Sequence, residues 1–104
     1  MADPVRLDLA QLTERDLKKI AALGDKVRLT HRWYRSEPSA DGASVTVYSG
    51  DRGPLPYASY RIARQPDGTY ELADARSGKR LAAGRTIDTV VAALPDDFFY
   101  ATRR

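Results

Sequence analysis

In the second half of the chain, apolar and polar positions alternate in two runs that predict a β-hairpin. Residues 57–64 and 70–73 both show the period of two that is typical of a half-buried strand. Between them, Pro66-Asp67-Gly68 combines a fixed φ, a side chain that bonds the turn backbone and a residue free to take positive φ. The apolar side chains expected to share one buried face of this hairpin are Tyr60, Ile62, Tyr70 and Leu72.

A third strand and a helix are expected to follow the hairpin. The turn at Ser77-Gly78 leads to residues 80–83, which are few enough for a short edge strand. Thr86 is suited to cap a helix that ends before Pro95. The apolar stripe of this helix, at spacings of three and four, consists of Ile87, Val90, Val91 and Leu94.

The first half of the chain has the pattern of a helix followed by a second hairpin. Thr13 and Asp16 fit a capping box at the start of a helix over residues 12–24, which Gly24 would end. Alternation then indicates strands at 27–34 and 44–49, joined by a polar loop. The side chains expected on one buried face of the strand at 27–34 are Val27, Leu29, His31 and Trp33. A short strand at 5–9 is a further expectation from alternation.

Together these elements predict an α+β fold in a single domain spanning residues 1–104. We expect an antiparallel sheet of about five strands, with an N-terminal and a C-terminal helix packed on one face. Residues 50–56 contain two glycines and two prolines and are expected to form the loop between the two hairpins. The ends, 1–4 and 101–104, are expected to be loose.

The composition is that of a small globular protein. The chain has 104 residues, no cysteine and a formal net charge of +3. Without cysteine there is no disulfide or thiolate chemistry, which fits a cytoplasmic location. No stretch has the length of a membrane span or the apolar centre of a signal peptide, so no membrane association is expected. Thirteen of the 17 basic residues are arginine, which indicates either a preference for phosphate or carboxylate partners or, the favoured interpretation, the codon bias of a GC-rich genome.

The sequence shows no catalytic motif, and neither a cofactor nor a metal is expected. His31 is the only histidine, and no zinc-binding or EF-hand spacing is present. The alternation pattern favours His31 as a packed core residue. Catalysis would require the fold to bring His31 together with a carboxylate in a deep pocket. We therefore expect a protein that acts by binding.

Protein–protein interaction or self-association is the favoured function. The chain has more large aromatic residues than a small core requires, among them Trp33 and Tyr48, and aromatic residues with arginine are enriched at interface centres. Residues 98–100 (Phe-Phe-Tyr) either fold back over the core, the favoured reading, or form a docking segment for a partner.

Binding of single-stranded nucleic acid is the alternative function. Residues 25–64 hold seven basic and four acidic side chains, and arginines between aromatics on a sheet can contact phosphates and stack on bases. In this reading Arg28, Arg32 and Tyr34 share one strand face, and Tyr57 and Arg61 share another. The candidate binding surface for either function comprises Arg28, Arg32, Tyr34, Tyr57, Arg61, Phe98, Phe99 and Tyr100.

Overall fold

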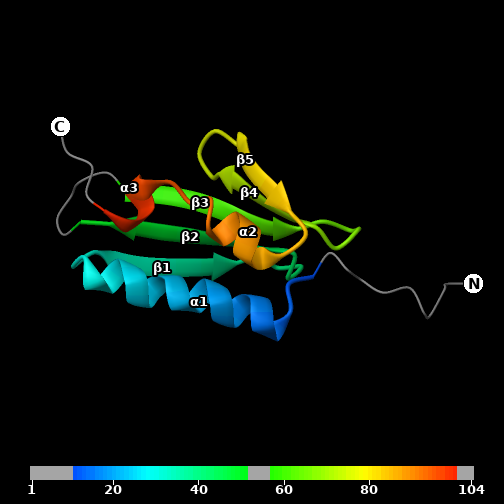
Figure 1. Ribbon diagram of the computed structural model, residues 1–104, viewed down its shortest axis with the longest axis horizontal. Coiled ribbons are helices and arrows are strands. Elements are labelled where there is room, and N and C mark those ends of the chain that lie inside the picture. Colours follow the sequence, from blue (N-terminus) through cyan, green and yellow to red (C-terminus); the bar gives the residue numbers. More distant parts are fainter. Residues whose placement is uncertain (1–10, 52–56, 101–104) are drawn as a thin grey trace, which may run out of the picture.

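The computed structural model describes residues 11–51 and 57–100 (Figure 1). Five antiparallel strands lie in the order β1-β2-β3-β4-β5, so each strand pairs with its neighbours in sequence. This confirms the predicted α+β class with a five-stranded sheet. The elements in chain order are α1 (Glu14–Leu29), β1 (Trp33–Pro38), β2 (Ser44–Gly50), β3 (Tyr57–Arg64), β4 (Tyr70–Asp74), β5 (Arg80–Gly84), α2 (Ile87–Val91) and α3 (Asp96–Phe99). The expected strand at 5–9, the loose ends and residues 52–56 of the interhairpin loop lie outside the described residues.

The β3–β4 hairpin has the predicted buried face. Ile62 lies opposite Leu72, and the four residues expected to share the buried face are all buried. The Pro-Asp-Gly turn places Gly68 at φ +90°, where a residue without Cβ is favoured. Edge strand β5 pairs with β4, with a register shift between Leu72 and Ala73.

All three helices cover one face of the sheet, and the core lies between the two layers (Figure 1). Helix α1 runs along β1, α2 packs on β4 and edge strand β5, and α3 packs on β2 and β3. The buried core consists of Ile20, Leu23, Val27, Val45, Val47, Tyr60, Ile62, Tyr70, Leu72, Ile87, Val90, Leu94 and Phe98. The opposite face of the sheet carries no helix among the described residues.

The start of α1 agrees with the prediction, but its end does not. The Thr13 hydroxyl accepts from the Asp16 amide at 3.1 Å, and the Asp16 carboxylate accepts from the Thr13 amide at 2.9 Å, which completes the capping box. The helix then continues through Gly24 to Leu29. Gly24 is buried inside it, because the ring of Tyr34 on β1 packs where a Cβ would lie, 2.8 Å from Tyr34 Cδ2.

The predicted strand at 27–34 is therefore wrong, since β1 begins only at Trp33. Val27 belongs to the helix, where it is buried on the same side as Ile20 and Leu23. Leu29 is 80% exposed in the last turn of the helix. The predicted pairing of the two strands survives, because β1 pairs with β2 from Trp33–Gly50 to Pro38–Val45.

His31 follows the C-cap residue Thr30 of α1 and is exposed, so the expectation of a packed core histidine is wrong. The His31 amide donates to Arg28 O at 2.9 Å and the Arg32 amide to Val27 O at 3.3 Å. This is the Schellman arrangement, in which the residue after the cap takes a left-handed conformation. His31 has φ +61°, in a position that glycine usually occupies.

The C-terminal segment contains a shorter helix than predicted and folds back over the core. Helix α2 begins after the Thr86 cap as expected but ends at Val91, and Leu94 is buried beyond it. The separate turn α3 then buries Phe98 completely. The fold-back of the aromatic segment is thus confirmed for Phe98. No helix among the described residues is long and apolar enough to cross a membrane.

Candidate functional site

Three aromatic side chains occupy adjacent strands on the open face of the sheet. Trp33 on β1 lies opposite Gly50 on β2, and Gly50 in turn lies opposite Tyr57 on β3. A Cβ at Gly50 would meet the indole of Trp33 at 2.8 Å, so the ring lies directly over the glycine backbone. Tyr48 points to the same side, two residues before Gly50. The absence of a side chain at Gly50 thus lets the Trp33 indole bridge toward Tyr57.

Trp33 and Tyr48 each pack against Tyr57, with their ring planes inclined rather than parallel. The centroids of Trp33 and Tyr57 are 6.1 Å apart at an interplanar angle of 54°. Those of Tyr48 and Tyr57 are 5.8 Å apart at 61°. Trp33 Nε1 also donates to Asp51 O at 3.0 Å, which fixes the indole at the edge of the row. Trp33 remains 38% and Tyr57 45% exposed, so the row is accessible to a partner.

Arginines frame this row. The Arg35 guanidinium lies 5.5 Å from the centroid of Tyr48, and the Arg76 guanidinium lies 4.8 Å from that of Tyr57. Arg76 also donates to Tyr57 O at 2.6 Å. Arg61, on the same side of β3, is exposed and forms no ion pair with any residue in 11–51 or 57–100. We call this surface the aromatic face, comprising Trp33, Arg35, Tyr48, Tyr57, Arg61 and Arg76.

Glu37 holds one edge of the aromatic face in place. It forms an ion pair with Arg35 and accepts from the Tyr48 hydroxyl at 3.0 Å. The hydrogen bond from Arg35 lowers the pKa of Glu37, and the bond to Glu37 raises the pKa of Tyr48. Glu37 therefore stays ionised, and the Arg35–Tyr48 pair keeps its arrangement at neutral pH.

Of the eight candidate residues, the structure places two on the aromatic face, Tyr57 and Arg61. Arg28 is exposed on α1 and pairs with Asp25 at 3.2 Å. Tyr34 faces the helices and donates to Ile20 O at 2.9 Å. The expectation that Arg28, Arg32 and Tyr34 share one strand face is therefore wrong, because residues 27–29 are helical.

Arg32 is buried and links three elements instead of facing a partner. Its guanidinium contacts Asp51 at 2.8 Å and donates to Asp97 O on α3 at 3.0 Å, while Nε has no hydrogen-bond partner among the described residues. A buried arginine with these bonds joins the start of β1, the end of β2 and α3. It is thus a structural residue.

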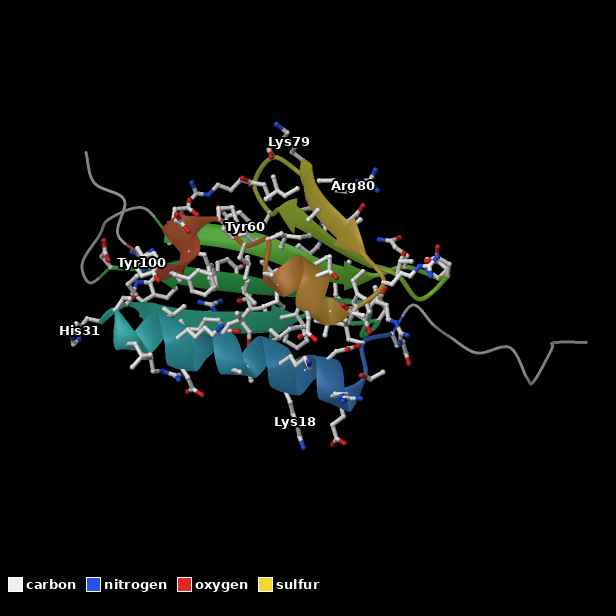
Figure 2. The ribbon with its side chains drawn as sticks, viewed as in Figure 1. Lys18, His31, Tyr60, Lys79, Arg80 and Tyr100 are labelled. Atoms are coloured by element: carbon white, nitrogen blue, oxygen red, sulfur yellow. The ribbon has the colours of Figure 1, made fainter. Side chains whose placement is uncertain are left out.

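The C-terminal aromatics lie on the helix side of the sheet, away from the aromatic face. Phe98 is fully buried, with its ring edge-on to Tyr34 and Tyr60 at 6.2 and 6.1 Å between centroids. Phe99 is half-buried, and Tyr100 is 56% exposed (Figure 2). The one candidate surface expected from the sequence is therefore divided between opposite sides of the sheet.

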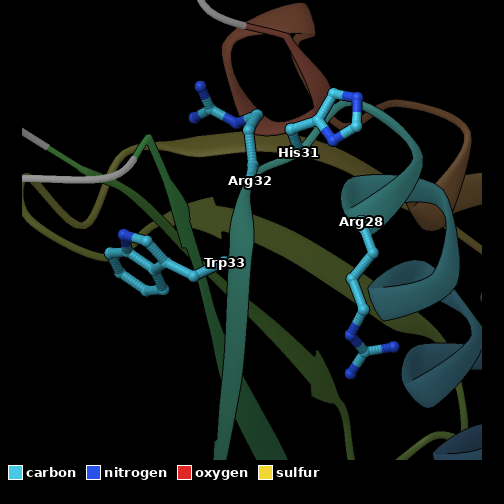
Figure 3. A pocket seen from close by; sticks show the side chains of 4 residues that line it. All are labelled: Arg28, His31, Arg32 and Trp33. Atoms are coloured by element: carbon cyan, nitrogen blue, oxygen red, sulfur yellow. The ribbon is translucent and has the colours of Figure 1, made fainter.

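His31 lies beside a pocket at the end of α1. A shallow pocket of about 280 Å³ is lined by Arg28, His31, Arg32 and Trp33 (Figure 3). The side chains of Trp33 and Arg28 lie on opposite sides of β1 and do not converge. Among residues 11–51 and 57–100, no carboxylate lines this pocket, and no group of three or more His, Cys, Asp or Glu side chains could hold a metal.

Comparisons with known proteins add no functional information. No protein-family model matches the chain, and neither a curated protein nor a solved structure matches it. Its function must therefore be argued from the surfaces described above.

Proposed function

We propose that this protein is a small, non-enzymatic cytoplasmic module that binds another protein through the aromatic face. The observation that carries the proposal is the row in which Trp33 and Tyr48 each pack against Tyr57, on the side of the sheet that the helices leave open. Tyrosine, tryptophan and arginine are the residues most enriched at the energetic centres of protein interfaces.

The aromatic face is preorganised for binding. Hydrogen bonds donated by the Trp33 indole and the Tyr48 hydroxyl, and the guanidinium over Tyr57, hold all three rings in place. Ordering flexible side chains at an interface costs free energy, so a surface that is already ordered loses less on binding. The strands beneath the rings add a rigid base.

The same geometry favours a protein over single-stranded nucleic acid. Bases stack on aromatic rings whose faces are free, whereas guanidinium groups lie over the rings of Tyr48 and Tyr57. Arg35 is also neutralised by Glu37, which reduces the attraction for phosphates. Arg61 favours nucleic acid, because it is an exposed cation beside the row. Nucleic acid is therefore the competing partner in the experiments that follow.

The proposal is tested by affinity capture from an extract of the source organism with three baits. These are the wild-type protein, the Tyr57→Ser variant and the Tyr100→Ser variant, which is the matched control because Tyr100 is exposed on the other side of the sheet. Amide NMR spectra establish that each bait is folded. We expect proteins that are retained by the wild type and by Tyr100→Ser but lost with Tyr57→Ser.

Two further measurements separate the competing partners. Sedimentation velocity over a concentration series detects a second copy of this chain as the partner, and Tyr57→Ser should then remove the dimer. Titration with a single-stranded oligonucleotide at two salt concentrations tests the alternative. Binding that falls steeply with salt and is lost in Tyr57→Ser would replace the protein hypothesis with nucleic acid. Identical protein sets on all three baits would refute the aromatic face as the binding surface.

A further inference from the structure

A second, larger cavity, also widely open to solvent, lies on the helix side of the molecule at the end where α1 begins. Its volume is about 610 Å³, within the range typical of small-molecule sites. The first turns of α1, the ends of β3 and β4 at their shared turn, and the connection from β5 to α2 form its walls. These segments converge at one end of the ribbon (Figure 1).

Cationic side chains from three different parts of the chain line this cavity. Arg15 and Lys19 are one helical turn apart on α1, Arg64 ends β3 and Arg85 precedes α2. The lining also includes two carboxylates, Asp16 and Asp88, so its described residues carry an excess of two positive charges. Side chains this far apart in sequence face a common space only because of the fold.

Both carboxylates are already engaged within the protein. Asp16 is buried and accepts from the Thr13 amide at 2.9 Å and the Tyr70 hydroxyl at 2.8 Å. Asp88 accepts from Lys19 Nζ at 2.8 Å on both oxygens. Arg15 and Arg85 are exposed and form no ion pair within 11–51 and 57–100. The unneutralised charge of the cavity therefore lies on arginines.

Arg64 is held in a fixed position at the wall. Its guanidinium lies 5.3 Å from the ring centroid of Tyr70 and donates to Gly68 O at 3.2 Å and Gln11 O at 3.1 Å. The amide ends of α1 do not contribute to anion binding, because Thr13 and Asp16 already cap them. Any affinity for an anion must come from the side chains.

We propose that this cavity binds a small organic phosphate as its dianion. An excess of two positive charges matches a phosphate monoester, which carries close to two negative charges above its second pKa of about 6. The planar guanidinium fork donates in pairs to phosphate oxygens. The cavity is larger than a single phosphate group requires, which leaves room for the organic part. This site lies apart from the aromatic face and is independent of the proposed protein partner.

The experiment is a two-dimensional NMR titration of the full chain with inorganic phosphate and with ribose 5-phosphate, at pH 7.5 and constant ionic strength. Amide and arginine Nε–Hε signals are followed. We expect saturable shifts of Arg15, Arg85 and their neighbours, with ribose 5-phosphate binding more tightly than phosphate. Equal affinities would contradict the organic-ester part of the proposal.

Three variants decide whether the cavity is the site. Arg85→Gln and Arg15→Gln should each weaken ribose 5-phosphate binding by about tenfold, the effect of losing one charge-assisted contact. Arg28→Gln is the matched control, since Arg28 is an exposed arginine at the other end of α1. Chemical-shift changes that rise linearly with phosphate concentration would mean an adventitious ion only. An equal loss of affinity in all three variants would mean the same.

The charge of the ligand supplies a separate test. At pH 5 ribose 5-phosphate is mostly a monoanion, so its affinity should fall severalfold relative to pH 7.5. Sulfate remains a dianion at both pH values and serves as the control. If the affinity for sulfate fell as much as the affinity for ribose 5-phosphate, the charge of the phosphate group would not explain the pH dependence, and its proposed role would be wrong. Arg85→Gln should leave capture through the aromatic face unchanged, so the two proposals can fail independently.

Discussion

The Tyr70 hydroxyl donates to the Asp16 carboxylate, at 2.8 Å to Oδ2 and 3.0 Å to Oδ1, and so joins the first turn of α1 to β4 across 54 residues of sequence. Both side chains are buried, with exposed fractions of 7% for Tyr70 and 4% for Asp16. Asp16 also completes the cap of α1. One carboxylate therefore caps the helix and fixes it to the sheet.

Replacement of Tyr70 by phenylalanine should destabilise the protein by about 1–3 kcal/mol, because a buried carboxylate then loses one of its donors. The free energy of unfolding is measured by urea denaturation followed by circular dichroism. Tyr100→Phe, at an exposed tyrosine, is the control and should change it by less than about 0.5 kcal/mol. Equal stability of the Tyr70→Phe protein and the wild type would show that this bond contributes nothing net.

Stability should decline at alkaline pH because of a buried tyrosine. Burial, together with the 2.5 Å hydrogen bond to Asp97 Oδ1, raises the pKa of Tyr60 well above that of a free tyrosine. A raised pKa in the folded state means that the protonated phenol stabilises the fold. That contribution is complete below the unfolded pKa of about 10 and is lost as the pH rises above it.

The measurement is the free energy of unfolding between pH 8 and pH 11, for the wild type and for Tyr60→Phe. The variant cannot ionise at this position, so its stability should fall less steeply above pH 10. Lysines and the other tyrosines titrate in both proteins and cancel in the comparison. Parallel curves for the two proteins would contradict the prediction.

His31→Gly should stabilise the protein by about 1 kcal/mol. The left-handed conformation at φ +61° is costly for a residue with a Cβ and nearly free of cost for glycine. His31→Ala is the matched variant, since it removes the imidazole but keeps the Cβ. If the alanine variant gains as much stability as the glycine variant, the effect belongs to the imidazole and not to the backbone.

Gly24→Ala should destabilise the protein, although alanine usually stabilises a helix interior by about 1 kcal/mol relative to glycine. The new Cβ would lie 2.8 Å from Tyr34 Cδ2, and the Tyr34 ring is held by its hydroxyl bond to Ile20 O. Overpacking of this kind costs about 1–3 kcal/mol.

The same substitution in a Tyr34→Ala background reverses the expectation. Without the ring the clash disappears, so Gly24→Ala should then stabilise the protein through helix propensity alone. Thermal unfolding of the wild type, the two single variants and the double variant gives the coupling free energy between positions 24 and 34. Additive effects would show that Gly24 is not required for the approach of Tyr34.

Features set by neighbouring residues could be predicted from the sequence. The Thr13 and Thr86 caps and the Pro-Asp-Gly turn depend on a few residues each, and alternation in β3 correctly assigned Tyr57 and Arg61 to the outer side. These signals are short-range in origin, so no knowledge of the fold was needed.

The end of α1 could not be predicted in this way. Val27 fits a helix with Ile20 and Leu23 as well as a strand with Leu29 and Trp33, so the two periods coincide. Glycine is a residue type that commonly ends helices, which is why Gly24 suggested a helix end. In the structure Gly24 instead makes room for the ring of Tyr34, a contact that depends on how α1 packs on β1. The same error displaced the start of β1.

This displacement is why most of the aromatic face was missed. A strand that begins at Trp33 puts its indole over Gly50 and beside Tyr57, whereas a strand over 27–34 put Trp33 in the core. Arg76 lies in the turn after β4, where alternation makes no prediction. The strand register alone would have located the row of rings.

The order of the strands also has a consequence for folding. Each strand pairs with its sequence neighbour, so the sheet can grow by successive local hairpins with little loop-closure entropy to overcome. The C-terminal segment is different, because Thr30 and Ser49 hold it through hydroxyl bonds to Phe99 O at 2.7 Å and Phe98 O at 2.6 Å. We therefore expect docking of Phe98 to be the late step that converts an assembled sheet into the finished molecule.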